Sequence, residues 1–378
     1  MAIRQRRCLR PSPRASRREP GNGRGNRSRL RRGPPKGRDR RTVTGLHART
    51  ALTLAALAAA LAGAALLALM VGTRPLAPAQ AWAALVQPDA ADPAHVVLRQ
   101  LRLPRLAAGL VAGAALGMAG VLMQAVTRNP LAEPGLLGVN AGASFAVVLG
   151  AFLFGVNDSA ALSALAFPGA ALAAAAVFVL GGAGRGGAGP VRLTLAGAAL
   201  TALLMSLVGA LVLVRTEALE VWRFWVVGSL ADAGSRPLAM MAMVALAGGL
   251  LALALGAALD ALALGEEAAR SLGARTGWVR AGTLAAVTAL CGAAVSLAGP
   301  VAFLGLMAPH LARALVGPGV RPMLLAAGLI GPLVLLLADV AGRVALPPGE
   351  VRVGVMTALL GGPVFILVAR RMRLGAPA

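Results

Sequence analysis

The sequence has no tyrosine and a single lysine, Lys36, among its 378 residues. A Walker A motif, GxxxxGK[ST], needs a lysine behind a glycine-rich turn, and Lys36 lies in an arginine-rich stretch without that motif. ATP binding by this route is excluded, so an ATP-driven process would need another chain. Histidine is also rare: His47, His95 and His310 are scattered, and no Cys/His group has metal-ligand spacing. We predict no metal, no cofactor and no catalytic role.

Charge is scarce too. Charged residues make up 13% of the chain and hydrophobic residues 58%, whereas soluble domains carry about 25% charged residues. Lipid is therefore the expected solvent. The two cysteines, Cys8 and Cys291, do not indicate a disulfide framework. The apolar segments hold essentially no ionisable residue, which argues against a proton- or ion-coupled secondary transporter.

The positive charge that is present gathers at the N-terminus. Residues 1–49 hold 17 of the 37 lysines and arginines and two of the 14 acids, and they are rich in Pro, Gly and Ser. This composition predicts a disordered basic cytoplasmic tail close to anionic lipid. A membrane-anchored nucleic-acid-binding protein is the alternative, although no folded nucleic-acid-binding module accompanies the tail.

Uncharged windows predict the membrane spans, each of which needs about 20 apolar residues. The seventh window is too long for one helix, and Gly299-Pro300 inside it breaks helical structure. The sequence thus predicts an all-α, polytopic membrane domain of about ten transmembrane helices over residues 50–373. The nine windows are 50–73, 106–127, 134–157, 159–184, 193–214, 237–259, 281–312, 322–338 and 353–369.

An even number of spans places both termini on one side of the membrane. The basic tail and the C-terminal Arg370, Arg371 and Arg373 predict that this side is the cytoplasm. Without the tail, the predicted inner segments carry 11 lysines and arginines and the outer segments nine, so the orientation depends largely on the tail.

Glycines recur at helical spacing. Gly109, Gly113 and Gly117 line one helix face and predict close helix packing, with a wall beside a translocation path as the alternative. The pattern Gly-Ala-Ala-x-x-x-Ala-Gly at 113–120 returns at 292–299, where it would run in the opposite direction across the bilayer. Inverted repeats of this kind are common in transporters.

Four blocks of sequence carry a family resemblance. They are RLPR at 102–105 with the following Asn-Pro-Leu-Ala-x-Pro-Gly, GPVAFLGLMAPH at 299–310, LADVAGR at 337–343 and the Gly349-Glu350 segment up to Phe365. In this order they resemble the FecCD/BtuC-type permease subunits of ABC importers for iron-siderophores, haem and cobalamin. The resemblance covers about residues 99–368, with Val351-Arg352 in place of the family's usual Leu-Pro.

The resemblance implies a type II ABC importer permease in the cell membrane (plasma or inner). Its partners would be a second copy of itself, two ABC ATPase subunits, an extracytoplasmic substrate-binding protein and a metal chelate such as a ferric siderophore; no nucleic acid is expected. A segment over 262–273 would couple to the ATPase, a solvated loop helix being the alternative. The signature turn consists of Asn129, Pro130, Leu131, Ala132, Pro134 and Gly135, and the coupling residues are Leu264, Gly265, Glu266, Glu267, Ala268, Arg270, Ser271, Leu272 and Gly273.

Two further sites are implied. Arg102 and Arg343 would dock the binding protein, unless they are helix-end anchors or Arg343 pairs with Asp339 four residues earlier. An inner gate would lie at Gly189-Pro190-Val191, which lacks the hydroxyl residues that the family often has there.

The function predicted is a permease for ferric siderophores, driven by ATP hydrolysed in a partner subunit. Haem or cobalamin is the alternative cargo. An ATP-independent secondary transporter or channel, and a zinc or manganese ABC permease, are the alternatives in mechanism and family.

Overall fold

The computed structural model describes residues 40–72, 75–181 and 190–374. The chain divides into two compact units, 1–44 and 45–378, and the fold described below is that of the second unit. Most of the predicted basic tail lies outside the described residues, and the first helix, α1, begins at Arg40. Every regular element in the described ranges is helical.

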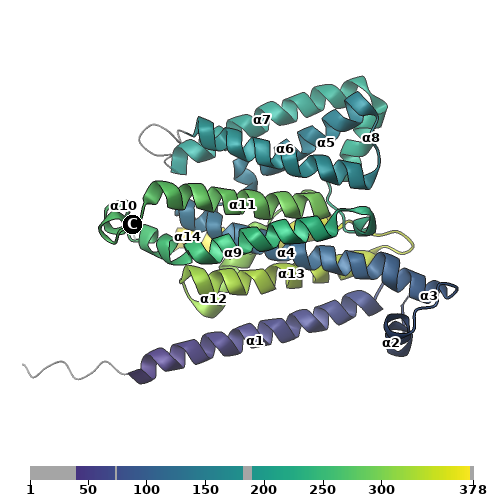
Figure 1. The fold of residues 1–378 in the computed structure, drawn as a ribbon, viewed down its shortest axis with the longest axis horizontal. Coiled ribbons are helices and arrows are strands. Elements are labelled where there is room, and N and C mark those ends of the chain that lie inside the picture. The colour runs from purple at the N-terminus through teal and green to yellow at the C-terminus, as the bar shows by residue number, and fades with distance from the viewer. Residues whose placement is uncertain (1–39, 73–74, 182–189, 375–378) are drawn as a thin grey trace, which may run out of the picture. The chain divides into compact units, whose positions relative to one another are not determined.

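Long helices make up most of this unit (Figure 1). They are α1 (Arg40–Met70), α4 (Leu103–Thr127), α6 (Ser159–Leu180), α7 (Pro190–Val214), α9 (Leu238–Ala263), α11 (Thr276–Ala298), α13 (Val320–Ala345) and α14 (Val353–Leu374). The shorter helices are α2 (Pro78–Val86), α3 (Pro93–Val96), α5 (Val139–Phe154), α8 (Thr216–Trp225), α10 (Glu266–Ser271) and α12 (Leu304–Val316). A π-helical turn, Val97–Arg102, leads into α4, and short 3₁₀ turns occupy Pro134–Leu137 and Ala233–Ser235.

The helix count agrees with the sequence prediction of about ten spans. Seven helices in the described residues are long and apolar enough to cross a membrane, and α5, α12 and α14 add three shorter apolar segments. The long window at 281–312 is split, because α11 ends at Ala298 and α12 begins at Leu304. The break at Gly299-Pro300 predicted from sequence is therefore confirmed.

Helix α4 lies at the centre of the bundle and packs against α9, α11, α12 and α13. Its glycine face allows this: a Cβ at Gly113 would meet the backbone of Pro332, one at Gly117 the carbonyl of Ala327, and one at Gly120 the carbonyl of Gly305. Small residues let helix backbones approach closely in membranes. The prediction of close packing along this face is confirmed.

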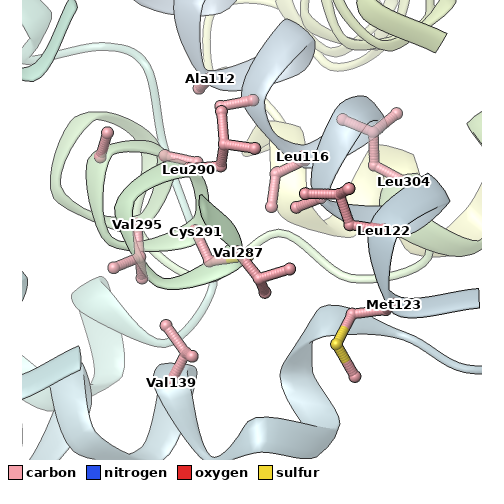
Figure 2. Packing of buried hydrophobic residues seen from close by; sticks show 14 of the residues in the cluster. Ala112, Leu116, Leu122, Met123, Val139, Val287, Leu290, Cys291, Val295 and Leu304 are labelled. Atoms are coloured by element: carbon pink, nitrogen blue, oxygen red, sulfur yellow. The ribbon is translucent and has the colours of Figure 1, made fainter. Parts of the chain in front are cut away.

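Apolar side chains fill the space between these backbones. Figure 2 shows Leu116 and Leu122 of α4 beside Val287 and Cys291 of α11, with Val139 of α5 below α11. All of these side chains are buried. The core therefore joins helices from both halves of the sequence.

The two ends of the bundle differ, and we name each by its residues. The RLPR end holds the start of α4, where Arg105 contacts Asp339 near the end of α13. The coupling end holds the C-terminal end of α4, where Arg128 contacts the carbonyl of Leu262 near the end of α9. Figure 1 shows α10 at the coupling end and α8 at the opposite end.

Candidate functional site

The signature turn follows α4 at the coupling end. Helix α4 stops because Arg128 adopts the left-handed conformation, with φ of 51°. The side-chain oxygen of Asn129 then accepts a hydrogen bond from the Leu131 amide at 2.9 Å. The backbone carbonyl of Asn129 accepts another from the Ala132 amide at 3.1 Å. Asparagine commonly fixes such turns by this local bond. The turn reverses the chain into α5.

The second half of the turn contacts the break between α11 and α12. Pro134 is buried, and a Cβ added at Gly305 would lie 2.7 Å from the Pro134 ring, so α12 approaches the turn closely. The Glu133 carboxylate accepts a hydrogen bond from the backbone amide of Phe303 at 2.9 Å. Phe303 is the N-cap residue of α12, with φ of 64°. A carboxylate in this place satisfies an amide that the helix leaves free and suits the helix dipole.

Glu133 is a site residue that the sequence analysis did not single out. Burial raises the pKa of its carboxyl, and the bond from Phe303 acts in the opposite direction. The available signal was an acid inside an otherwise apolar signature, between Ala132 and Pro134. Its partner 170 residues later could not be read from spacing.

The turn is also joined to the predicted coupling segment. The Arg128 guanidinium donates to the carbonyl of Leu262, the residue at which that segment begins. The signature turn and the coupling segment are therefore neighbours in the fold, which the sequence prediction did not state.

The coupling segment contains a short helix, α10, with a glycine on either side. Gly265 has φ of 122° and Gly273 has φ of 82°, conformations that side chains with a Cβ adopt at a cost. Glu266 accepts hydrogen bonds from Arg270 at 2.7 Å and Arg280 at 3.0 Å. The positive charge of Arg280 is the main reason why the pKa of the Glu266 carboxyl lies below its usual value. Burial acts in the opposite direction, and the hydrogen bond from Arg280, the charge of Arg270 and the hydrogen bond from Thr276 lower the pKa further. This network fixes α10 on the first turns of α11.

Several other side chains of the segment are exposed, whereas Leu262 and Ala269 are buried. Leu264 and Leu272, each directly before one of the two glycines, are 74% and 68% exposed. Glu267, Arg270 and Ser271 are exposed as well. Both leucines are therefore accessible for contact with a partner.

Arg102 and Arg343, the two predicted docking residues, are buried at the RLPR end, 6% and 4% exposed. Arg102 donates to the carbonyl of Leu69, and Arg343 donates to the carbonyls of Ala68 and Val71 at 2.9 Å each. The carbonyls of Ala68 and Leu69 belong to the last turn of α1, where a helix leaves carbonyls without an internal partner, and Val71 directly follows the helix. The anchoring alternative is thus present in the structure. A docking role stays a prediction, and it requires a guanidinium to leave these carbonyls.

The second arginine of RLPR links the cluster. Arg105 forms an ion pair with Asp339 at 2.8 Å and another with Glu350 at 2.8 Å. Asp339 also pairs with Arg343 at 3.3 Å, the i,i+4 pair that the sequence suggested. The sequence analysis did not assign Arg105 a role, because the motif alone does not tell which arginine faces α13.

Only part of the predicted inner gate lies in the described residues. Gly189 lies outside the described residues, and Pro190 and Val191 begin α7. Val191 is 70% exposed. The gate stays a prediction. The His310 ring nitrogen Nδ1 lies 2.9 Å from the carbonyl of Leu306, four residues earlier on the same helix. The described residues contain no cluster of three His, Cys, Asp or Glu side chains that could hold a metal ion.

The comparisons with known proteins agree with this geometry. The model of the FecCD transport family matches residues 56–371, which is most of the chain. The chain belongs to the FecCD transport family. It is accordingly a multi-pass membrane permease of ABC importer type with an all-helical fold.

Curated relatives and a solved structure cover most of the same region. The ferric enterobactin transport system permease protein FepD of Escherichia coli (strain K12) is 48% identical over 279 residues, 74% of this chain and 83% of that protein. The hemin transport system permease protein HmuU of Yersinia pestis is 37% identical over 284 residues, with 74% and 84% covered. A metal-chelate type ABC transporter solved in an inward-facing conformation matches with a TM-score of 0.71 and 28% identity, covering 85% of this chain and 99% of that one.

Proposed function

We propose that this chain is the transmembrane permease subunit of a binding-protein-dependent ABC importer for ferric siderophores. The observation that carries the proposal is the coupling segment: a helix fixed by Glu266, with exposed leucines around it, in a chain of the FecCD transport family. The names of the relatives support the cargo, since the enterobactin permease is 48% identical and the hemin permease 37%. Haem is therefore the second candidate.

ATP hydrolysis belongs, in this proposal, to a separate ATPase with two copies per transporter. The chain has one lysine and no Walker A motif, so it cannot cradle nucleotide phosphates by that motif. Leu264 and Leu272 would enter a groove of the ATPase, and the charged residues of α10 would surround the contact. Aliphatic anchors with a polar rim are the usual anatomy of such an interface.

Three contacts then give a route from the ATPase to the centre of the bundle. The Glu266–Arg280 ion pair joins α10 to α11. The bond from Arg128 to Leu262 joins the coupling segment to the residue directly before the signature turn. The bond from Phe303 to Glu133 joins that turn to α12. Movement of α10 would therefore be passed to the turn and to the break between α11 and α12, and access to the path would alternate.

The remaining partners follow from the same proposal. A second copy of the chain would form the path together with this one, and an extracytoplasmic binding protein would dock at the RLPR end. Both termini would lie in the cytoplasm of a cell whose plasma or inner membrane holds the chain. The exposed apolar side chains of α7 and α14 support a face in contact with lipid or with a second copy; they include Leu195, Leu203, Leu359 and Ile366.

Uptake measurements test the proposal directly. A strain that lacks this chain should lose accumulation of one labelled ferric siderophore and keep accumulation of haem and cobalamin. Co-purification from detergent should retain an ATPase subunit, and vesicles that hold the chain alone should not concentrate the chelate. Loss of haem uptake alone would transfer the proposal to the second cargo, and uphill transport by the lone chain would refute it.

A further inference from the structure

An apolar groove of about 520 Å³ runs along the bundle between α1, α4, α9 and α13. Leu110 and Met118 of α4 form its floor, Ala245 and Leu253 of α9 one wall, and Leu325 and Gly328 of α13 the other. Leu54 of α1 contributes from the outside. With this lining, water gains no hydrogen bond inside the groove, so a hydrocarbon is the chemically suitable occupant.

Helix α1 leaves this space open because it is attached mainly at one end. Its last carbonyls accept the bonds from Arg102 and Arg343 at the RLPR end. Toward the coupling end, α1 touches the core through Leu54 and Leu57, which are only partly buried. Of the most apolar window of α1, 11% is buried inside the chain, against 61% for α4. The gap beside α1 is therefore not filled by the chain itself.

The length of the groove suits one lipid tail. Along α9 the lining extends from Ala242 to Leu253, which is about 16 Å at 1.5 Å per residue. The hydrocarbon of one leaflet is half of a core that is about 30 Å thick, or about 15 Å. An acyl chain thus matches the groove along its long direction.

Two arginines lie at the coupling end of this groove. Arg321 is exposed, and its Nε donates to the carbonyl of Leu253, one of the lining residues, at 3.2 Å. Arg49 of α1 is exposed and lies five residues before Leu54. The acid Asp260 lies about two turns beyond Leu253 on α9. Its carboxylate accepts a hydrogen bond from the backbone amide of Val320 at 3.0 Å. An apolar slot with guanidinium groups at one end has the chemical pattern of a phospholipid.

We infer that this groove binds one phospholipid with an anionic head group. One of its acyl chains would lie on Met118 and Gly328, and its phosphate would accept hydrogen bonds from Arg321, with Arg49 adding charge. Guanidinium groups pair with phosphate through parallel hydrogen bonds, and each arginine near an anionic leaflet favours binding. The bound lipid would fill the space between α1 and the bundle. This inference is independent of the transported cargo.

Native mass spectrometry of the full chain, extracted from bilayers of equal parts phosphatidylglycerol and phosphatidylcholine, tests the inference. The wild type should retain phosphatidylglycerol in preference to phosphatidylcholine. Arg321→Gln should reduce that preference about fivefold, the factor expected for about 1 kcal/mol per arginine near the surface. Arg275→Gln removes another exposed arginine from the coupling end and should leave the preference unchanged.

Filling the groove tests the acyl chain. A Cβ at Gly328 would make ordinary contact with Met118 at 3.6 Å, so Gly328→Phe should fit while its ring blocks the groove, and retention of both lipids should be lost. Gly209→Phe on α7 is the matched control, because a Cβ there meets nothing within 4 Å. If Gly328→Phe does not fold, Ala245→Phe fills the same groove from α9.

Three results would overturn the inference. A folded groove-filling variant could retain phosphatidylglycerol as the wild type does. Arg275→Gln could lower the preference as much as Arg321→Gln, which would indicate bulk charge rather than a site. Gly328→Phe could convert a dimer into monomers with lipid retention unchanged, which would make the groove a contact between two copies of the chain.

Discussion

The RLPR end and the coupling end both carry arginines and acids, but they use them differently. At the RLPR end, Asp339 and Arg343 are almost fully buried, and the bonds of Arg343 go to carbonyls of this same chain. At the coupling end, Glu266 and Arg270 are partly exposed, and bare leucines lie beside them. The charged cluster of the first end is satisfied within the chain, and the second end keeps charged and apolar side chains exposed.

Burial explains why the two clusters should respond differently to mutation. A buried charge that loses its partner is left without solvation, whereas an exposed one returns to water at little cost. We therefore expect stability to depend on the buried cluster of the RLPR end and ATPase binding to depend on the coupling end. The predictions below test this comparison, from the largest expected effect to the smallest.

The largest effect is expected for Asp339→Ala, which leaves Arg105 and Arg343 without their shared carboxylate. Breaking a buried pair costs about 3–5 kcal/mol, so the free energy of unfolding should fall by that order. Thermal unfolding in detergent measures the change. Glu217→Ala, an exposed acid on α8, is the control and should leave the melting temperature unchanged. Equal melting temperatures for the two variants would remove the contrast between the ends.

The second prediction concerns the exposed leucines of the coupling end. Replacing Leu264 and Leu272 by Asp should weaken binding of the ATPase subunit at least tenfold, because truncating central anchors of an interface costs about 2 kcal/mol or more. The melting temperature should stay near that of the wild type. Co-purification of the ATPase from detergent measures binding, with Leu346→Asp, 66% exposed near the RLPR end, as the control. Retained ATPase in the double variant would contradict the coupling assignment.

The third prediction tests the connection between the signature turn and α12. Glu133→Ala leaves the Phe303 amide without its acceptor and should cost about 1–3 kcal/mol in the free energy of unfolding. Glu133→Gln keeps an acceptor oxygen and should recover most of that loss. Chelate uptake should follow the same order at equal protein levels. If both variants transport like the wild type, the turn does not transmit movement through this bond.

The smallest effect is a pH dependence at the coupling end. Arg280 lowers the pKa of the Glu266 carboxyl from 4.5, so its stabilising contribution is present above pH 4.5 and is lost as the pH falls through the lowered pKa. Because about a third of the side chain is exposed, screening limits the contribution to about 1 kcal/mol or less. Hydrogen exchange of α10 amides should accelerate below pH 4.5, once corrected for intrinsic rates. Glu266→Gln should abolish this acceleration, and an unchanged profile would contradict the ion pair.

Local sequence was sufficient for the elements and for their breaks. Uncharged runs predicted the spans, and Gly299-Pro300 predicted the gap between α11 and α12. Gly265 and Gly273, which the resemblance placed in the coupling segment, have positive φ angles on either side of α10. The glycine face of α4 was also predictable, because only a residue without a Cβ permits the backbone contacts at Gly113 and Gly117.

Long-range partners were not predictable in this way. Glu133 meets Phe303 across 170 residues, and Arg105 meets Asp339 across 234. Spacing along one helix gave the Asp339–Arg343 pair, but no local pattern indicates that Arg343 also reaches the carbonyls at the end of α1. The sequence therefore favoured exposed docking arginines where the fold places buried ones.

The sequence by itself determined that this chain resides in lipid as a bundle of helices and that it lacks a nucleotide-binding motif. Both follow from composition, since apolar runs without charge are stable only in a membrane and a phosphate-binding loop needs its lysine. Only the tertiary structure decided which charges face inward and where the signature turn makes contact. Burial and pairing depend on which helices pack together, and helix packing joins residues that are far apart along the chain.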